Sequence, residues 1–499
     1  MKVRTRAVWQ NTIRKYKVTP VKLFEPESLQ DIVSIIQEAE TKDLKVRAVG
    51  SGHSFSDVAV TEEYLVDLFR LVHADHYNTQ VRKEEFKNNK LVECQAGIRL
   101  REVNSQLDAM GLALINMGAV DHQKLAGVVA TGTHGTGKDY EAMQGFVQSF
   151  VLVAGGGKVY RIEKTNGITD PAKFNEPGME LIQDDDIFYS AVLSFGSMGI
   201  IYSLVMEVRE SYYLRETKLL TNWEELKKIW QDGSIFTKGD KESAGAPPRS
   251  VTFMINPYKL KNKKTGKEEF NCAVMRNYYT SKPTKWILWE ATRNLVTYIF
   301  GNFPVTYWYS LFVFNYLPHR APKLIRSTIK GSNDKKFVHK SYKVLFQGFQ
   351  FVKERAYSSE FAFDIHDKDV AINAIEKIMD LAKRMQEDAK LYHSSPITVR
   401  FVKRSKAFLA TEYGRDVAYI DVPFVQRTRG TETMLELCQQ ALFDHGGIPH
   451  WGKYNTILDG KPEFLVATYP QLDKWKTTLK KLDPKGTFNN HFMERIGLV

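Results

Sequence analysis

Cysteine is scarce in this sequence of 499 residues. The three cysteines, Cys94, Cys272 and Cys438, are odd in number and far apart, a spacing that excludes a disulfide framework and a CxxC metal site. This usage fits a reducing compartment. The first residues, MKVRTRAVWQNTIRKYK, also lack the apolar core of a signal peptide, so we expect a cytoplasmic or peripheral membrane protein.

Acidic residues are fewer than basic ones. The 70 Lys and Arg against 58 Asp and Glu give a net charge of +12, which favours anionic partners such as a phosphorylated cofactor, an acidic lipid surface or a nucleic acid. An ordinary surface with a basic excess is the alternative. No RNA- or DNA-binding motif accompanies the charge, so we expect no nucleic-acid partner.

Two familiar nucleotide-binding loops are absent. Residues 132–138, GTHGTGK, follow the P-loop pattern as far as its lysine, but Asp139 stands where the metal-binding Ser or Thr should be. Gly50 and Gly52 begin a GxGxxG pattern, and Phe55 occupies the place of its last glycine. The sequence therefore predicts neither loop.

A long run without charge spans residues 294–318. Aromatic side chains crowd it, and its length approaches that of a membrane span. Gly301, Asn302 and Pro304 interrupt it, and Tyr and Trp are more typical of a membrane interface than of a bilayer centre. Three interpretations stay open: an aromatic core segment or subunit contact, a membrane-surface patch, and a true span.

Residues 46–57, VRAVGSGHSFSD, combine a predicted strand with a glycine turn. The apolar residues 46–49 predict a short buried strand. Gly50 and Gly52 allow a tight turn that a ligand can approach closely. His53 then lies beside several backbone N–H donors, which suits a phosphate and a reactive nitrogen next to an aromatic cofactor. A purely structural histidine is the alternative.

Residues 116–137, NMGAVDHQKLAGVVATGTHGTG, are too rich in glycine for a regular helix. We expect connected short turns there, with N–H groups that face a polar group. In the last predicted strand, Arg400 lies between apolar neighbours, so a solvent-facing and a functional arginine both stay open. Periodicity predicts helices at 28–42, 100–110, 369–390 and 431–445, and strands at 91–96, 146–153, 159–162, 359–365 and 397–402, with a long buried strand within 195–208.

Four motifs follow one another in a specific order: VRAVGSGHSFSD, residues 116–137, IPHWGK and DPKGTFNNHF. With them the chain resembles the vanillyl-alcohol-oxidase type of flavoproteins, specifically the sugar-1,4-lactone and alditol oxidases. The resemblance implies an α+β fold, in which a two-part FAD-binding domain of the vanillyl-alcohol-oxidase/PCMH type carries an α+β cap domain over the flavin. We expect residues 1–212 to form the FAD-binding domain, 213–455 the cap, and 456–499 the return to the FAD-binding domain.

The resemblance implies FAD as the cofactor, covalently attached through His53, and no metal. A hydrogen bond from His53 to an unattached flavin is the alternative. The turns at 50–54 and 127–137 would hold the pyrophosphate, and residues 196–201 would line the adenine or ribose end. The implied cofactor-binding residues are Val49, Gly50, Ser51, Gly52, His53, Ser54, Ser56, Gly118, Ala119, Gly127, Ala130, Thr131, Gly132, Thr133, His134, Gly135, Gly137, Gly196, Gly199, Ile200, Ile201, Lys453 and Asn490.

Two small residues bear on the electron acceptor and the substrate. Gly118 matches the position that separates oxidases from dehydrogenases in the family, where a glycine leaves dioxygen a path to the flavin. Ala119 resembles the gulonolactone-oxidase-like members, whereas alditol oxidase has serine there. The resemblance therefore implies an oxidase and favours a lactone substrate.

The resemblance also implies charged residues over the flavin. Arg400 and Lys453 match two cations that would bind the substrate and stabilise the negative charge that develops on the flavin. Relatives usually carry Glu two residues before this arginine, and Thr398 departs from that pattern. Glu360 resembles a carboxylate that precedes the cap helix, and we expect it to be catalytic together with Arg400 and Lys453. His450 is expected either to bind the substrate or to pack against the neighbouring tryptophan.

Taken together, the resemblance implies an FAD-dependent oxidase of a sugar-1,4-lactone of the L-gulono-, L-galactono- or D-arabinono-lactone type. Hydride transfer to flavin N5 and reoxidation by O2 would release hydrogen peroxide. Two alternatives share the fold: an alditol (polyol) oxidase, and a lactone dehydrogenase that uses another electron acceptor. A membrane-surface binding protein organised around residues 294–318 is an alternative of a different class. The expected partners are a small-molecule lactone or polyol, O2, and a peripheral membrane contact through 294–318.

Overall fold

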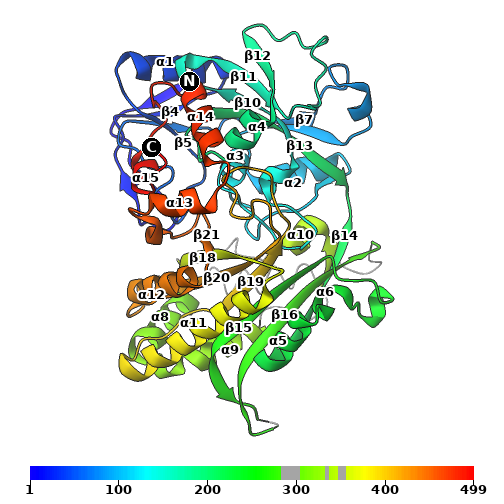
Figure 1. The fold of residues 1–499 in the computed structure, drawn as a ribbon, viewed down its shortest axis with the longest axis vertical. Coiled ribbons are helices and arrows are strands. Elements are labelled where there is room, and N and C mark those ends of the chain that lie inside the picture. Colours follow the sequence, from blue (N-terminus) through cyan, green and yellow to red (C-terminus); the bar gives the residue numbers. More distant parts are fainter. Residues whose placement is uncertain (264, 283–303, 332–336, 347–355) are drawn as a thin grey trace.

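The strands before residue 211 and those after residue 212 belong to different sheets (Figure 1). The computed structural model describes residues 1–263, 265–282, 304–331, 337–346 and 356–499. Within these ranges, three larger sheets carry most of the strands, and a short pair formed by β2 (Trp9–Gln10) and β3 (Lys17–Val18) lies apart from them. Helices pack on the sheets, which confirms the predicted α+β class.

The first sheet contains the strand predicted at residues 46–49. Its order is β1 (Lys2–Arg4), β4 (Lys22–Glu25), β6 (Tyr64–Asp67) and β5 (Val46–Val49), with the last three strands parallel. The connection from β4 to β5 is α1 (Leu29–Thr41), and Ser28 Oγ accepts a hydrogen bond from the Asp31 amide at 3.1 Å at its start. Since β5 and β6 are parallel, the glycine turn after β5 lies beside the carboxyl end of β6.

The second sheet is mostly antiparallel. Its order is β12 (Met179–Gln183), β11 (Val159–Glu163), β10 (Val147–Val153), β13 (Ile200–Glu210), β8 (Leu91–Gln95) and β7 (Ala74–His76), and β9 (Leu112–Leu114) also pairs with β13. The predicted hairpin is confirmed as β10 and β11, and the predicted long buried strand is β13. Helix α2 (Leu100–Ala109) confirms the prediction at 100–110, and α4 (Asp185–Ala191) lies between β12 and β13 in the sequence.

The third sheet forms the lower part of Figure 1. Its order is β17 (Phe337–Lys340), β14 (Tyr213–Asn222), β16 (Glu268–Thr280), β15 (Ser250–Lys261), β19 (Ile397–Val402), β20 (Val417–Val425), β18 (Ala356–Asp364) and β21 (Ile448–Pro449). The helices of this part are α5 (Trp223–Gln231), α6 (Ser234–Thr237), α9 (Ala321–Gly331), α10 (Ser341–Leu345), α11 (Lys368–Asp388) and α12 (Thr431–Asp444).

Alternation along the central strands gives this sheet two different faces. Ile397, Val399 and Phe401 of β19 are fully buried in one apolar cluster with α5, α11 and α12. The residues between them, Thr398 and Arg400, must project from the opposite face because successive side chains of a strand alternate. The helices therefore cover one face, and the polar face is left for a site.

The C-terminal segment returns to the N-terminal part. Helices α13 (Pro462–Thr468), α14 (Leu472–Leu482) and α15 (His491–Arg495), drawn in red, lie beside the blue elements of Figure 1. Arg47 of β5 donates from Nη1 to the Phe488 carbonyl at 2.8 Å, and Arg495 Nη2 lies 2.6 Å from Asp57 Oδ1. These contacts tie the last residues to the strand and turn at 46–57.

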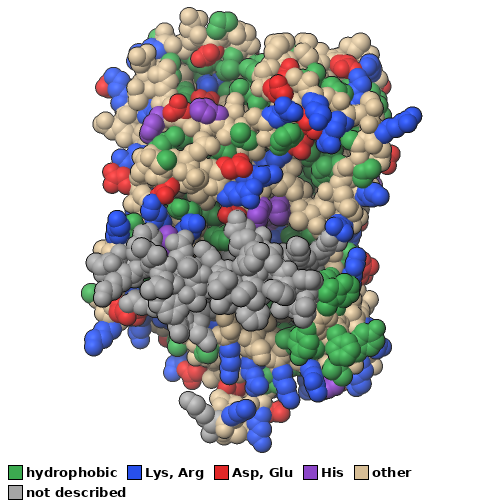
Figure 2. Space-filling view, turned by 180° about the vertical axis from the view of Figure 1, so that it is seen from behind, with side chains coloured by type: hydrophobic (Ala, Val, Ile, Leu, Met, Phe, Trp, Pro, Cys, Tyr) green, Lys and Arg blue, Asp and Glu red, His purple; other side chains and the backbone are tan. Residues whose placement is uncertain are grey.

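Helix α8 (Pro304–Tyr316) exposes a cluster of aromatic side chains. Residues 294–303 of the uncharged run lie outside the described residues. No helix within the described ranges has the length and hydropathy needed to cross a bilayer. Figure 2 shows hydrophobic side chains gathered low on one face, above a row of Lys and Arg side chains. The aromatic cluster consists of Trp308, Tyr309, Phe312 and Tyr316, which are 51–74% exposed.

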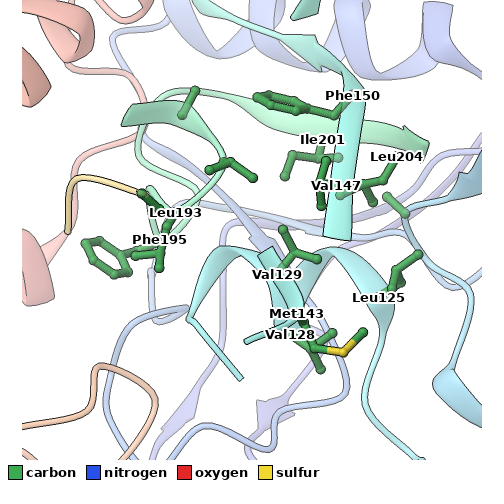
Figure 3. Close-up of a cluster of buried hydrophobic side chains, with 14 of the residues drawn as sticks. Leu125, Val128, Val129, Met143, Val147, Phe150, Leu193, Phe195, Ile201 and Leu204 are labelled. Carbon is green, nitrogen blue, oxygen red and sulfur yellow. The ribbon is translucent and has the colours of Figure 1, made fainter. Parts of the chain in front are cut away.

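Residues 116–137 contain one regular element that the sequence analysis did not predict. Six residues form the short helix α3 (Leu125–Ala130), so the expectation of turns throughout this stretch is wrong. Figure 3 shows Leu125, Val128 and Val129 among side chains of the second sheet, and all three are buried. Burial of these side chains outweighs the cost of about 1 kcal/mol for the single glycine within the helix.

Candidate functional site

A large cavity of about 960 Å³ opens beside the glycine turn that follows β5. The predicted cofactor-binding residues that line it are Val49, Gly50, Ser51, Gly52, His53, Ser54, Ser56, Gly127, Ala130, Thr131, Gly196, Gly199 and Ile201. The fold thus brings together three predicted segments that are far apart in the sequence.

The turn at residues 51–54 presents unpaired amides. In the described part of the chain, the N–H groups of these four residues have no hydrogen-bond acceptor. Gly52 has φ +68°, and a Cβ built on it would lie 3.1 Å from Asn11 Cα, so a larger residue would be both strained and crowded. Consecutive free N–H groups in a turn form a binding site for an anion such as a phosphate.

His53 supplies an uncharged imidazole at the wall of the large cavity. Burial, and then the charge of His122, lowers the pKa of His53 to about 4. The two rings stack with centroids 6.3 Å apart, and neither nitrogen of His53 has a hydrogen-bond partner among the described residues. At neutral pH the ring therefore carries a nitrogen lone pair that is available to a ligand.

The large cavity also contains residues that the sequence analysis missed. Lys124 is only 5% exposed, forms an ion pair with Asp67 at the end of β6, and has a pKa that burial lowers. The parallel pairing of β5 and β6 places Asp67 beside the glycine turn, but this pairing cannot be read from the residues alone. Trp9 and Asn11 reach the cavity from the N-terminal segment and have no motif that could have indicated them.

A smaller, narrow cavity lies where the polar face of the third sheet meets residues 117–136. It is lined by Met117, Ala119, Gly135, Thr136, Glu216, Thr252, Met275, Asn277, Val344, Leu345 and Arg400. The Arg400 guanidinium has neither a hydrogen bond nor an ion pair with any described residue. This cation is therefore available to a ligand in the small cavity, which favours the functional interpretation of Arg400.

Lys453 is held against the glycine turn by the loop that contains it, residues 450–453, called here the Lys453 loop. The Phe55 amide donates to the Gly452 carbonyl at 2.8 Å, and Ser56 Oγ donates to the Trp451 carbonyl at 2.9 Å. Its Nζ lies 3.0 Å from Ser358 Oγ and 5.4 Å from the centre of the Phe55 ring. The fold thus places a fixed ammonium group beside the turn that carries His53.

Two carboxylates face Lys453. Its Nζ lies 3.4 Å from Glu360 Oε2 and 3.4 Å from Asp421 Oδ1. Burial lowers the pKa of Lys453, but the charges of Asp421 and Glu360 outweigh burial and raise it overall, while the charge of Arg400 opposes them. The interaction with Arg400 shows that the two predicted cations lie close enough to influence each other.

Glu360 is almost fully buried beneath this cation. Burial raises the pKa of its carboxyl, but Lys453 and His134 outweigh burial and hold the pKa well below its ordinary value. His134 Nε2 lies 3.5 Å from Glu360 Oε1, and the His134 ring stacks on Tyr419 at 3.9 Å. Glu360 is therefore an ionised group that stabilises the positive charge of Lys453.

Three ligand-type atoms of His134, Glu360 and His450 lie within 4.8 Å of one another, a spacing at which a metal ion could bind. His450, however, uses both ring nitrogens, because Nδ1 accepts from the Gly452 amide at 3.1 Å and Nε2 donates to the Gly132 carbonyl at 3.0 Å. It has no lone pair left for a metal. Its ring packs edge-on against His134 and Tyr419, so the structure favours a packed His450 with different neighbours from the predicted tryptophan.

Several predicted cofactor residues lie outside the walls of the large cavity. Ala119 and Gly135 line the small cavity. Gly118 lies close to the large cavity, because a Cβ built on it would be 3.1 Å from Thr133 Cγ2 and 3.8 Å from Oε1 of the cavity residue Gln123. The residues that line neither cavity are Gly118, Gly132, Thr133, His134, Gly137, Ile200, Lys453 and Asn490, together with Glu360 and His450.

Comparison with known proteins gives matches over nearly the whole chain. Residues 20–163 match a family model described as an FAD binding domain, and residues 268–496 match one described as D-arabinono-1,4-lactone oxidase. An L-gulonolactone oxidase from Scyliorhinus torazame is 25% identical over 503 residues, which cover 98% of this chain and 97% of the relative. An L-gulono-1,4-lactone dehydrogenase from Mycobacterium tuberculosis is 26% identical over 498 residues, which cover 98% of this chain and 99% of the relative.

A solved structure shares the fold. The crystal structure of cholesterol oxidase from B. sterolicum aligns with a TM-score of 0.74 at 14% identity, and covers 99% of this chain and 97% of that chain. At this level of identity the likeness concerns the fold alone. It supports the predicted fold class.

Proposed function

Because the chain belongs to the sugar-1,4-lactone oxidase family of the vanillyl-alcohol-oxidase type of flavoproteins, we propose that it oxidises a sugar-1,4-lactone and passes the electrons to dioxygen. It is an FAD-dependent oxidoreductase that acts on CH–OH groups. The relatives include both an oxidase and a dehydrogenase, so the acceptor and the particular lactone are part of the proposal.

The residues of the large cavity fit FAD. The free amides of residues 51–54 suit the pyrophosphate, and the mostly apolar lining of the cavity suits the ring of a flavin. Lys124 adds a cation to the same cavity. We propose that these groups hold the cofactor and that His53 attaches it covalently, which the uncharged and unpaired imidazole supports.

The proposal rests chiefly on the Lys453 loop, which is hydrogen-bonded to residues 55 and 56 and so sets a cation beside the cofactor turn. Bound FAD supplies a two-electron acceptor for the hydride of the substrate carbinol, and dioxygen restores it with release of hydrogen peroxide. Lys453 and Arg400 stabilise the negative charge that develops during this transfer. Lys453 also favours loss of the hydroxyl proton, because a nearby cation stabilises an alkoxide.

Gly118 supports dioxygen as the acceptor. It has no side chain, and a Cβ at this position would lie 3.1 Å from Thr133 Cγ2 and 3.8 Å from Oε1 of the cavity residue Gln123. Ala119 lines the small cavity beside Arg400, and its resemblance to the gulonolactone-oxidase-like members supports a lactone over a polyol. An alditol oxidase and a lactone dehydrogenase are the second candidates, and they differ from the proposal in substrate and acceptor.

We also propose that the aromatic cluster of α8 lies on a membrane surface. Trp308 and Tyr316 are 61% and 74% exposed, which is unusual for large aromatic side chains in a soluble surface. On the neighbouring helix α9, Lys323 and Lys330 are exposed as well. Aromatic side chains beside a basic rim suit an anionic lipid interface.

One experiment tests the oxidase assignment. The purified protein is expected to absorb near about 450 nm, as bound flavin does. Hydrogen peroxide release is then compared for L-gulono-, L-galactono- and D-arabinono-1,4-lactone, and for xylitol and sorbitol. Preferential release with a lactone supports the proposal. A protein that stays colourless after FAD is supplied contradicts it, and dye reduction without oxygen uptake would identify a dehydrogenase.

A further inference from the structure

Asp421 stands in register with two residues of the candidate site. On β20 it pairs with Glu360 of β18 on one side and with Thr398 of β19 on the other. Directly paired residues of antiparallel strands project from the same face, so the three side chains form a polar row across the sheet. The adjacent row on that face contains Thr252, Arg400 and Tyr419, of which the first two line the small cavity.

The two oxygens of Asp421 differ in their contacts. Oδ1 accepts a hydrogen bond from Ser358 Oγ and lies 3.4 Å from Lys453 Nζ. Oδ2 accepts no hydrogen bond from any described residue, and it is not among the fully buried polar atoms. Asp421 lines neither cavity, but Oδ2 keeps some exposed surface and has no hydrogen bond to a described residue, whereas the oxygens of Glu360 are enclosed by Lys453 and His134.

Thr398, in the same row, has a hydroxyl and no carboxylate. Its Oγ1 is buried and has no hydrogen-bond partner within the described ranges. Glutamate is the residue that the resemblance leads one to expect there, two positions before Arg400. The chain thus lacks a carboxylate at 398 and has one at the position directly opposite, on the neighbouring strand.

We propose that Asp421 is a substrate-binding residue, which supplies from β20 the carboxylate that Thr398 lacks and accepts a hydrogen bond at Oδ2 from a ring hydroxyl of the lactone. This inference rests on the proposed function, since it deepens the account of how that substrate is held. Ser358 and Lys453 fix Oδ1 and so orient Oδ2. Arg400, two residues from Thr398, binds the same ligand from the adjacent row.

The principal variant is Asp421→Asn, which keeps the size of the side chain and an oxygen for Ser358 but removes the charge. We expect the KM for the lactone to rise about tenfold or more, as for loss of a charged hydrogen bond. The absorbance of the bound flavin should not change. Calorimetry can compare the affinities of the wild type and Asp421→Asn without turnover. Its ligand is the deoxy lactone that lacks the hydroxyl that would be oxidised.

A series of deoxy lactones separates substrate binding from a structural role. If Asp421 accepts a hydrogen bond from one hydroxyl, Asp421→Asn should not change the KM for the analogue that lacks this hydroxyl. Equal penalties for every analogue would show that Asp421 only balances the charge of Lys453, and would overturn the inference. An unchanged KM for the full substrate would overturn it as well.

A matched double variant moves the carboxylate back across the strand pair. Thr398→Glu with Asp421→Thr should recover most of the affinity that Asp421→Thr alone loses, because the charge returns to the same row. A double variant no better than Asp421→Thr, with flavin still bound, contradicts the inference. A wild-type protein that binds no flavin or oxidises none of the lactones would instead overturn the proposed function.

Discussion

Arg400 remains unpaired because its cross-strand neighbours carry no charge. Thr252 and Tyr419 stand opposite it on the two adjacent strands, so no carboxylate is in register with the guanidinium. Lys453, by contrast, is paired with two carboxylates and fixed in place. Among the described residues, one of the two predicted cations therefore has carboxylate partners and the other has none.

His53 allows a direct test of covalent attachment. We expect His53→Ala to bind FAD that acid precipitation releases into the supernatant, whereas wild-type flavin should stay with the precipitate. Since the pKa of His53 is about 4, the imidazole is neutral throughout the usual pH range, and attachment should show no inflection near the ordinary value of about 6.5. Absorbance of both fractions is the measurement. Acid-released flavin in the wild type would contradict the attachment.

Lys453 should matter more for chemistry than for cofactor binding. We expect Lys453→Ala to slow flavin reduction by about a hundredfold, the usual effect of removing one charge-stabilising group. Stopped-flow reduction and FAD affinity are compared, with Lys453→Arg as the control that keeps the charge. Equal losses of both properties would make Lys453 a cofactor ligand.

Gly118 is predicted to control the reaction with oxygen. Gly118→Ala should lower oxygen uptake by about tenfold or more and leave reduction by the substrate unchanged. The added methyl group would also press on Thr133 Cγ2 at 3.1 Å. The double variant Gly118→Ala with Thr133→Ser removes this contact, so recovery of oxygen uptake would indicate crowding rather than a closed path.

Part of the candidate site could be predicted from the sequence. His53 and its glycine turn were predicted because their residues are contiguous, and the cavity lies where they indicated. Asp421 was not predicted, because its importance depends on which strands pair and in which register. Lys124 was missed for a related reason, since its partner Asp67 becomes a neighbour only through the parallel pairing of β5 and β6.

At the scale of elements, the strands and longer helices follow from periodicity. The predicted helix at 369–390 is confirmed as α11, and the strand at 397–402 as β19. The sequence could not decide whether Arg400 is a solvent-facing or a functional residue. Its neighbours on both sides are apolar, and this pattern fits a strand with either face buried. The short helix α3 is stabilised by its packing on the second sheet. It was not predicted, because residues 116–137 are rich in glycine.

Helix α8 provides a prediction at this scale. Replacing Trp308, Tyr309 and Phe312 by Ser should reduce flotation with vesicles rich in phosphatidylserine by about tenfold, because exposed aromatic area drives interfacial binding. Val466→Ser on α13 is a matched control, since Val466 is 70% exposed. Vesicles of phosphatidylcholine alone should bind less protein. Flotation that the triple variant retains in full would contradict the membrane contact.

At the scale of the molecule, the expected boundaries at residues 212 and 455 remain a prediction. The strands change sheet between β13 and β14, and the C-terminal helices lie with the N-terminal part. These features are compatible with the expected division. The order in which the segments meet could not be derived from local patterns, because residues 46–57 and 483–495 are far apart in the sequence.

Acid should destabilise the whole fold. Burial lowers the pKa of His393 to about 3. Burial also lowers the pKa of His450 to about 4, although the charge of Glu360 opposes this shift. Below about pH 6.5 the unfolded chain binds protons that the folded chain does not, so stability falls as the pH falls. The free energy of unfolding falls by about 1.4 kcal/mol per pH unit for each such histidine. For His393 this amounts to about 3 kcal/mol between about pH 6.5 and 4.

Thermal unfolding between about pH 7 and pH 4.5 measures this dependence. His393→Gln removes one of the titrating groups and should give a shallower slope. His393 contacts Cys438 and Phe424 rather than the cavities, so flavin content serves as the control for an intact fold. A slope that His393→Gln leaves unchanged would show that this imidazole does not contribute.

The return of the C-terminal segment has a consequence for biosynthesis. Asn490 donates to the carbonyls of Val58 and Val60, and Arg495 pairs with Asp57, so the turn that would carry the flavin gains these supports only when the final helix exists. A ribosome makes the first of these partners hundreds of residues before the second. These contacts can form only after the ribosome has made residue 495, so residues 57–60 lack them during most of translation.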